Sequence, residues 1–363
     1  MTTSQPQRPV QGDHVALIIG RRHAWPDATR GFGVVAVVMF HVIIWDYYTL
    51  ANGSSIALNF WQSTDVVLGR FRMPVLFALS GLLCSRGLLL GWKDSKNFVR
   101  VATNSYLYSI WLTLYFLFFT YIFKDSFPHS VFGVADWIEQ FWIPDTTLWF
   151  VLALAVYPVF FIFSNMFLPR HFGVYGVSIL LWGISGLVDP PVFIGKIMEH
   201  FIFYAFGVCA ASTLWGFSKA KWYEFFALVL LMTTTLYLGT LFDSPVRAVF
   251  TALSNALAIP IIIVVMGLVC KVRVLANLGS FIGSHTLPIY LLHPIFLALW
   301  SSVSVEIFRL IQGIALFNWL YPFLLTIAVV GACLVSNFVL ARLPGNFLFK
   351  LPPVLHDLVK KKI

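Results

Sequence analysis

Charged residues are scarce in this chain: Asp, Glu, Lys and Arg make up only 11% of its 363 residues, whereas 59% are hydrophobic. A soluble domain of this length has too little interior to hide so much apolar surface, so the composition excludes a soluble globular protein. Because a backbone surrounded by lipid has to satisfy its own hydrogen bonds, we expect an all-α integral membrane protein built of spanning helices.

Cysteine is also rare, and its four copies show no spacing of a disulfide pair or a metal motif. We therefore expect small packing residues and no metal site. The sequence also lacks a nucleotide-binding P-loop, a dinucleotide fingerprint, a zinc-protease pair and a serine elbow. Neither an arginine-rich voltage helix nor a channel filter sequence is present. The four cysteines are Cys84, Cys209, Cys270 and Cys333.

The net charge of +9 does not indicate a nucleic-acid partner. The basic residues are scattered in short clusters between apolar runs, and no basic domain holds them together. They are typical of topology signals in a protein whose partner is membrane lipid.

Ten segments are apolar and long enough to predict a bundle of about ten transmembrane helices. The fifth is short and carries Gly183 and Gly186, which makes it the weakest of the ten. The predicted spans are Gly31–Leu50, Met73–Trp92, Thr103–Phe123, Thr147–Leu168, Phe172–Val188, Ile197–Phe217, Tyr223–Phe242, Val246–Cys270, His285–Phe308 and Phe317–Leu340.

The distribution of basic residues predicts that both termini are cytoplasmic. With ten spans, eighteen of the 24 Lys and Arg residues fall in cytoplasmic segments, as the positive-inside rule requires. We expect a cytoplasmic tail over residues 1–26 without a cleavable signal peptide, a ten-helix membrane domain over 27–345 and a basic cytoplasmic tail over 346–363. The six basic residues left outside are Arg70, Arg72, Lys124, Lys196, Arg247 and Arg309.

The first span carries the most informative pattern, RGFGVVAVVMFH, which places Arg30 eleven residues before His41. Eleven helical steps return to nearly the same face, about 16 Å further along the helix. Ionisable side chains are expensive inside a membrane and usually mark a site. The alternative is that Arg30 anchors the helix at the interface and His41 is a hydrogen-bonded packing residue.

Three further residues near span ends are candidates for binding substrate. Asp27 can pair with Arg30 three residues later, or can simply cap the helix. Arg72 opens the second span in FRMPVLFALSG, as a substrate ligand or an outer-interface anchor. Trp149 opens the fourth span, where it fits a pocket wall or the interfacial aromatic belt.

The ninth span, GSHTLPIYLLHPIF, holds a second intramembrane histidine, His293. Pro288 and Pro294 loosen the backbone around it, which suits the lining of a cavity. Together with His41 it offers a candidate for acid–base chemistry near neutral pH, although a helix–helix hydrogen bond is an equal alternative. The long connector Lys124–Thr146 is rich in aromatic residues and predicts a short helix in the outer interface, or a surface that stacks on a sugar.

At these residues the chain resembles the polytopic bacterial acyltransferases of the acyltransferase-three superfamily, and in particular the branch related to fucose O-acetylases. The resemblance rests on R-x10-H at Arg30 and His41, FRMPVLFALSG, LWFVLALAVY and GSHTLPIYLLHP, which occur in the expected order. It implies an inner-membrane acyltransferase that moves an acyl group, often acetyl from acetyl-CoA, onto a hydroxyl of an envelope glycan or a lipid-linked sugar.

The resemblance also implies site residues. The R-x10-H pair of such proteins maps onto Arg30 and His41, and an arginine pair at the start of their third span matches this sequence only partly. Here that region reads KNFVR, so Arg100 is expected to bind the donor and Lys96 is doubtful. We expect acyl-CoA to dock from the cytoplasm near Arg30 and Arg100, with His41 as general base or transient acyl carrier. Arg72 and His293 would shape the acceptor side.

Two other classes of function stay open at this point. A transporter or flippase of a polar or lipid-linked solute also uses intramembrane histidines and broken helices, although no matching interrupted segments occur in two halves of the chain. A non-catalytic assembly or sensor protein would not need His41.

Overall fold

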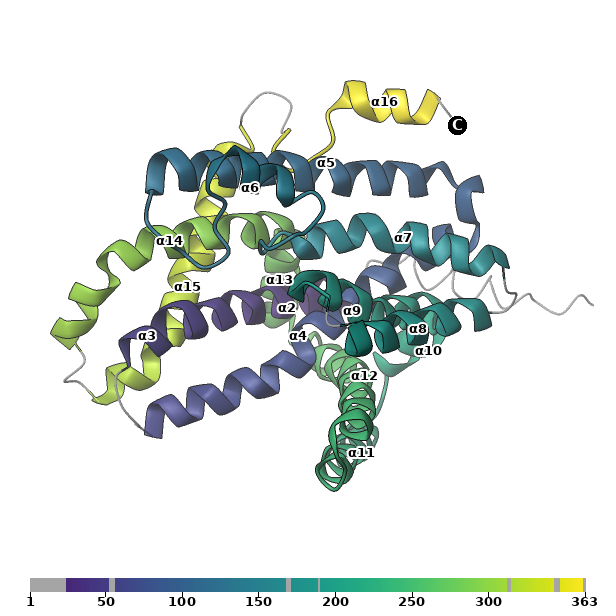
Figure 1. Cartoon of the computed structure of the whole chain (residues 1–363). Helices are drawn as coiled ribbons and strands as arrows, with labels where there is room; N and C mark the ends of the chain where they lie inside the picture. Colours follow the sequence, from purple (N-terminus) through teal and green to yellow (C-terminus); the bar gives the residue numbers. More distant parts are fainter. Residues whose placement is uncertain are drawn as a thin grey trace, which may run out of the picture.

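The computed structural model describes residues 24–51, 56–167, 171–188, 190–311, 315–342 and 347–361. Within these ranges the chain forms helices and no β-strand, which confirms the predicted all-α membrane protein (Figure 1). The predicted tail over 1–26 lies almost wholly outside the described residues.

Nine helices in the described part of the chain are long and apolar enough to cross a membrane. The first and third continue through π-helical turns, Ile43–Tyr47 and Phe118–Phe123. The nine are α2 (Ala24–Val42, continued to α3, Tyr48–Leu50), α4 (Ile56–Leu89), α5 (Ser95–Leu117), α7 (Trp149–Phe167), α9 (Val192–Cys209), α11 (Trp222–Thr240), α12 (Ser244–Val269), α14 (Thr286–Ile311) and α15 (Ala315–Leu340).

The fifth predicted span is α8 (Phe172–Val188), an apolar helix of 17 residues. Its neighbours α7 and α9 run in the same direction, because Trp149 stacks near Phe193 and Tyr157 lies beside Tyr204. A helix that joins the end of α7 to the start of α9 has to run back along both. This supports ten crossings, with α8 as the short one.

The structure corrects several predicted boundaries. The second span is part of a much longer helix, since α4 begins at Ile56 and not at Met73. The aromatic connector contains the expected short helix, α6 (Gly133–Glu139). Three further helices were not predicted as separate elements: α10 (Ala211–Phe217), α13 (Arg273–Ser284) and α16 (Pro353–Lys361).

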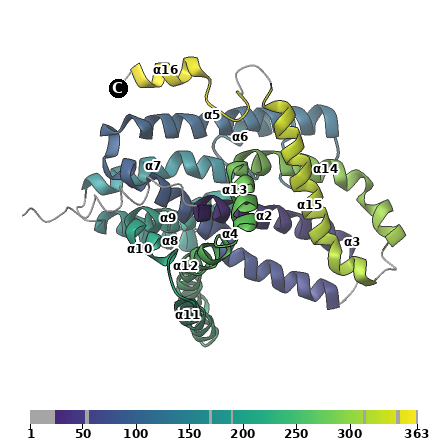
Figure 2. The ribbon, with the colours of Figure 1, turned by 180° about the vertical axis from the view of Figure 1, so that it is seen from behind.

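Helix α2 is the central element of the bundle. It contacts α4, α12, α13, α14 and α15, and its residues Val34, Val37 and Val38 are almost fully buried. Figure 2, seen from behind, shows α13 and α15 crossing α2 on this side. Side chains on α2 are therefore held between neighbours rather than exposed to lipid.

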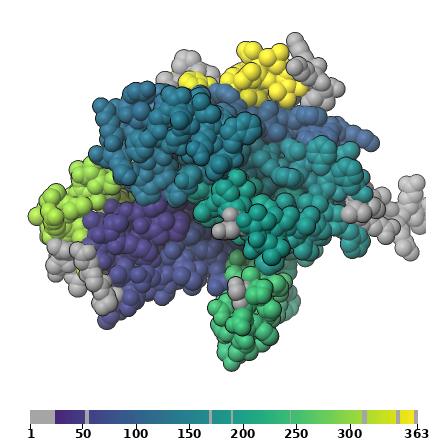
Figure 3. Space-filling view, viewed as in Figure 1, coloured from purple at the N-terminus to yellow at the C-terminus, as the bar shows by residue number. Residues whose placement is uncertain are grey.

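Glycines allow the closest helix contacts in the bundle. A Cβ atom at Gly207 of α9 would lie 1.9 Å from the carbonyl oxygen of Ala78, and one at Gly81 of α4 would lie 2.2 Å from that of Tyr204. Any larger side chain there would push α4 and α9 apart. By contrast, the hairpin of α11 and α12 projects from the rest of the bundle (Figures 1 and 3).

The described start of the predicted C-terminal tail is docked on the bundle. The indole of Trp111 in α5 donates a hydrogen bond to the carbonyl oxygen of Leu348 at 2.7 Å, and both Leu348 and Phe349 are buried. Amphipathic helix α16 follows this contact, with Val354, Leu355 and Leu358 exposed. The tail is thus anchored to α5 by its first residues.

Candidate functional site

A pocket of about 300 Å³ opens between α2, α4, α7, α9 and α14. This volume is at the lower end of the range of small-molecule sites. No carboxylate occurs among its lining residues, which are Val37, Phe40, His41, Ile44, Trp45, Gly69, Arg72, Met73, His129, Thr147, Trp149, Phe193, Lys196, His200 and Tyr290. The pocket therefore combines basic and aromatic side chains without an acidic one.

His41 and His293 meet directly beside this pocket. His41 Nδ1 lies 2.9 Å from His293 Nε2, and the fully buried His293 has its Nδ1 3.2 Å from the carbonyl oxygen of Ile289. A carbonyl oxygen only accepts, so His293 Nδ1–H donates to it and His293 Nε2 keeps a lone pair. His41 Nδ1–H must then donate to His293. The remaining lone pair is on His41 Nε2, so this nitrogen is free to accept a proton, as a general base must.

The ring of His41 is also held from its other side. Trp45 stacks on it with ring centroids 4.0 Å apart and an angle of 27° between the planes. The π-helical turn Ile43–Tyr47 begins two residues after His41 and contains Trp45. Such turns insert one residue into a helix and are frequent at functional sites. The imidazole is thus fixed by a hydrogen bond on one edge and a stacked ring on one face.

Arg72 brings a positive charge into the same pocket. Its guanidinium donates to Asp65 Oδ1 at 2.9 Å, two turns earlier on α4, and its Cζ atom lies 3.5 Å from the centre of the Phe40 ring. Both side chains of the ion pair are largely buried. The structure therefore places Arg72 with His41 in one pocket rather than at a lipid-facing surface.

Trp149 also lines the pocket, and only 7% of it is exposed. Its ring stacks near Phe193, with centroids 5.9 Å apart. This position fits the pocket-wall interpretation rather than the aromatic belt. A role for Trp149 in binding substrate stays a prediction.

Three basic pocket residues were missed by the sequence analysis. His129 comes from the connector after α5, with its Nδ1 3.2 Å from Asp145 Oδ1, while Lys196 and His200 lie one turn apart on α9. All three line the same pocket as His41. The only indication of these pocket residues in the sequence was weak: Lys196 and His200 are four residues apart, which places them on one face of a helix.

Arg30 lies at the opposite end of α2 and does not line the pocket. Its guanidinium forms an ion pair with Asp27 Oδ1 at 2.8 Å, so the pairing expected for Asp27 is present. Both side chains are about one-third exposed. The Nε atom of Arg30 is buried and has no hydrogen-bond partner among the described residues, which leaves one donor for a ligand.

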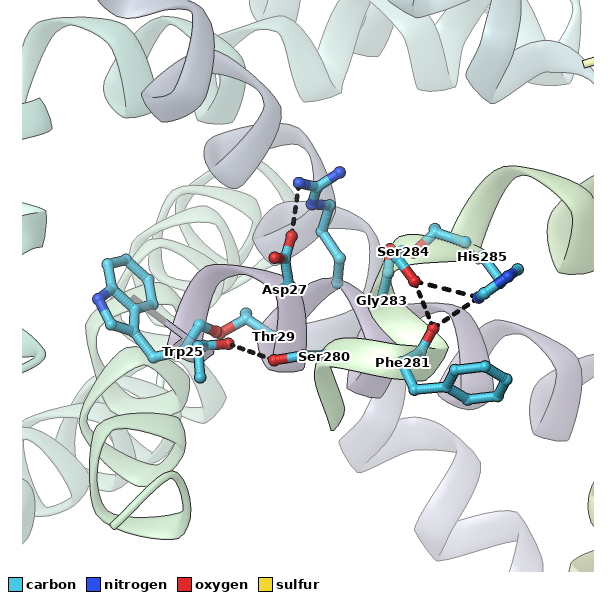
Figure 4. A network of polar contacts seen from close by, with 11 residues as sticks. Trp25, Asp27, Thr29, Ser280, Phe281, Gly283, Ser284 and His285 are labelled. Atoms are coloured by element: carbon cyan, nitrogen blue, oxygen red, sulfur yellow. Dashed lines mark hydrogen bonds and ion pairs between the residues drawn. The ribbon is translucent and has the colours of Figure 1, made fainter. Parts of the chain in front are cut away.

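Helix α13 fixes this end of α2 (Figure 4). A Cβ atom at Gly283 would lie 1.8 Å from the carbonyl oxygen of Asp27, and one at Gly31 would lie 2.8 Å from that of Gly279. The sequence GSFIG at 279–283 is thus a small-residue contact motif that sequence reasoning overlooked. This contact between α13 and α2 fixes the position of Asp27.

Arg100 belongs to the same end of the bundle as Arg30. It donates a hydrogen bond to Asn97 Oδ1, and Asn97 donates to the carbonyl oxygens of Gly87 and Gly91. The charges of both Arg30 and Arg100 act on the Cys84 thiol of α4. The two predicted donor-binding arginines therefore both lie near Cys84, and neither lines the pocket that contains His41.

A buried acid in the first span was not predicted either. Asp46, within the π-helical turn, accepts a hydrogen bond from the hydroxyl of Tyr321 on α15, which in turn accepts one from the indole of Trp300 at 3.0 Å. Asp46 is not part of the pocket lining. Its contacts pin the end of α2 to α14 and α15.

Comparison with known protein families identifies the family of the chain. A family model described as an acyltransferase domain matches residues 23–337, which include every helix from α2 to α14 and most of α15. A search of curated proteins and of solved structures finds no match. The matched range covers most of the chain and both ends of α2, so this multi-pass membrane protein belongs to the acyltransferase-three family.

Proposed function

We propose that the chain transfers an acyl group, expected to be acetyl, from cytoplasmic acyl-CoA to a hydroxyl of an envelope glycan or related acceptor in the inner membrane. The observation that carries this proposal is the hydrogen bond between His41 and His293 at the wall of a pocket. It leaves the lone pair of His41 on Nε2, so His41 can act as a base at the wall of this pocket.

The chemistry follows from this tautomer. His41 Nε2 takes the proton of the acceptor hydroxyl while the hydroxyl oxygen attacks the thioester carbonyl carbon. The carbon–sulfur bond then breaks, and the proton passes from His41 to the departing CoA thiolate. Throughout, Nδ1–H of His41 keeps its hydrogen bond to His293, so the ring does not turn between the two proton transfers.

Donor binding is assigned to the other end of α2. Arg30 offers an unpartnered buried Nε–H, and Arg100 adds a second guanidinium in the same region. Guanidinium groups bind phosphates through paired hydrogen bonds, which suits the phosphates of CoA. Asp27 holds the Arg30 side chain in place through its ion pair. This arrangement supports a donor that enters from the cytoplasmic side predicted for Arg30.

The test is release of CoA by the purified protein in detergent or nanodiscs. We expect wild-type protein to release free CoA from acetyl-CoA in the presence of an envelope extract from its own cell, and to label a component of that extract. A protein that binds no acetyl-CoA and releases no CoA, while folded, would contradict the proposal.

A further inference from the structure

We infer that the acceptor carries a negative charge, so that the pocket beside His41 binds a sugar bearing a phosphate or a carboxylate. This inference rests on the proposed function, because it names the class of acceptor that the same site takes. It comes from the imbalance of charge around the pocket.

The imbalance begins with the lining itself. Arg72 and Lys196 are both lining residues, together with His129 and His200, and no Asp or Glu lines the pocket. Carboxylates do stand nearby, but each is directed elsewhere. Asp65 is paired with Arg72, and Asp145 accepts from His129.

Lys196 is the pocket cation that lacks a close carboxylate, since the charges of Glu199 and Asp145 act on it only from beyond ion-pair distance. No ion pair within 4.0 Å joins it to a described residue, and its ammonium lies 4.5 Å from the centre of the Phe193 ring. Glu199, three residues later on α9, lines a second cavity between α8, α9 and α12, and His200 lines both this cavity and the pocket. A partly buried ammonium held over an aromatic ring retains its hydrogen-bonding capacity for an anion.

The remaining walls fit the rest of such an acceptor. Trp45, Trp149 and Phe193 line the pocket with aromatic side chains, which suit contact with the apolar face of a sugar ring. His41 borders the same space, so an acceptor anchored on Lys196 would hold its hydroxyl beside the base. Arg30 and Arg100, expected to bind the CoA phosphates, lie at the other end of α2 and leave this pocket to the acceptor.

Binding can be tested without turnover. Purified wild-type protein would be titrated with glucuronate and with inorganic pyrophosphate at constant ionic strength, and binding followed by the rise in unfolding temperature. Glucuronate probes a carboxylate acceptor, and pyrophosphate a phosphorylated one. We expect at least one of them to bind, and Lys196→Gln to weaken it by about tenfold or more.

Two variants make this result specific. Lys196→Arg keeps the charge and should retain most of the binding. Arg309→Gln removes one positive charge from α14 outside the pocket lining and should bind like wild type. Equal binding by all four proteins, or no binding of either anion to wild type, would overturn the inference.

An acetyl-transfer assay provides a second test of the inference. Radiolabelled acetyl groups moved onto envelope extract would be separated by anion exchange, and the labelled product should be retained. Label only in the neutral fraction would refute an anionic acceptor while leaving acyl transfer itself established. Acetyl-CoA affinity should stay within about twofold in Lys196→Gln. A parallel tenfold loss would mean that the pocket holds the phosphates of the donor, and would also overturn the inference.

Discussion

His41 Nδ1 lies 2.9 Å from His293 Nε2, and a backbone carbonyl behind His293 decides which of the two rings donates. The pair joins α2 to α14, two helices about 250 residues apart along the chain. The proposed reaction divides the roles accordingly: His41, which lines the pocket, would exchange the proton, whereas His293 would hold it in one tautomer.

The first prediction concerns His41. Replacing it with alanine removes the base, and we expect turnover of acetyl-CoA to acceptor to fall by about 10²–10⁴-fold or more. CoA release by matched amounts of folded protein provides the measurement. His285→Ala is the control, because His285 caps the end of α13 and does not line the pocket. Near-normal turnover by His41→Ala would show that His41 is a packing residue and not the base.

The second prediction concerns His293 as a positioning residue. His293→Ala should lower kcat less than His41→Ala does, since His41 keeps its Nε2 but loses the partner that selects its tautomer. His293→Gln can accept the hydrogen bond from His41 through its amide oxygen, and should recover part of the rate. The acceptor KM should change little in both variants. No difference between the alanine and glutamine variants would argue against control of the tautomer.

The third prediction concerns Arg30. Arg30→Ala should weaken acyl-CoA binding, and Arg30→Lys should restore only part of it, because lysine keeps the charge but loses the paired hydrogen bonds of a guanidinium. Affinity would be measured in detergent at matched folded fractions. If both variants bind acyl-CoA as tightly as wild type and only insertion into the membrane suffers, Arg30 is an interfacial anchor.

The fourth prediction concerns the contact between α2 and α13. Gly283→Ala would place a Cβ atom 1.8 Å from the carbonyl oxygen of Asp27, so the helices must separate. We expect a loss of about 1–3 kcal/mol of stability, as for other overpacked sites, and weaker acyl-CoA binding at the displaced Arg30. Gly331→Ala is the matched control, because nothing lies within 4 Å of a Cβ atom there. Thermal unfolding that is equal in both variants would contradict the close contact.

The fifth prediction concerns topology. Reporter fusions after Phe167 and after Pro191 should report opposite sides of the membrane if α8 crosses it, and a fusion at the C-terminal Lys360–Lys362 should report the cytoplasm. Identical reports from the first two fusions would reduce the bundle to nine crossings. Periplasmic activity of the C-terminal fusion would reverse the predicted orientation of the last helix.

The sequence predicted the spans well because lipid imposes one simple demand, a run of apolar residues about as long as the membrane is thick. It could not predict the start of α4, since the segment from Ile56 to Arg72 mixes polar and apolar residues and buries only Ala57 and Trp61. Nor did it predict α13, whose amphipathic sequence was read as a connector. The glycines that seat α13 on α2 become meaningful only with the partner helix in place.

The site was predicted where one helix carried the pattern. Arg30 and His41 are linked by helical spacing, and His293 was found because a histidine in an apolar span is unusual. His129, Lys196 and His200 were missed for a physical reason. The packing of α9 against α4 brings Lys196 and His200 near His41, and the path of the connector after α5 brings His129 there.

The buried valines of α2 lie between its two polar ends, with Arg30 on one side and the basic pocket on the other. Val34, Val37 and Val38 pack into the apolar core, which has the low permittivity that ions cannot enter without losing their hydration. We expect this apolar stretch to keep ions from passing between the two ends of α2. The protein can thus hold binding sites for charged molecules at both of its ends while the membrane keeps its potential, and only a thin, uncharged thioester arm would need to cross the layer.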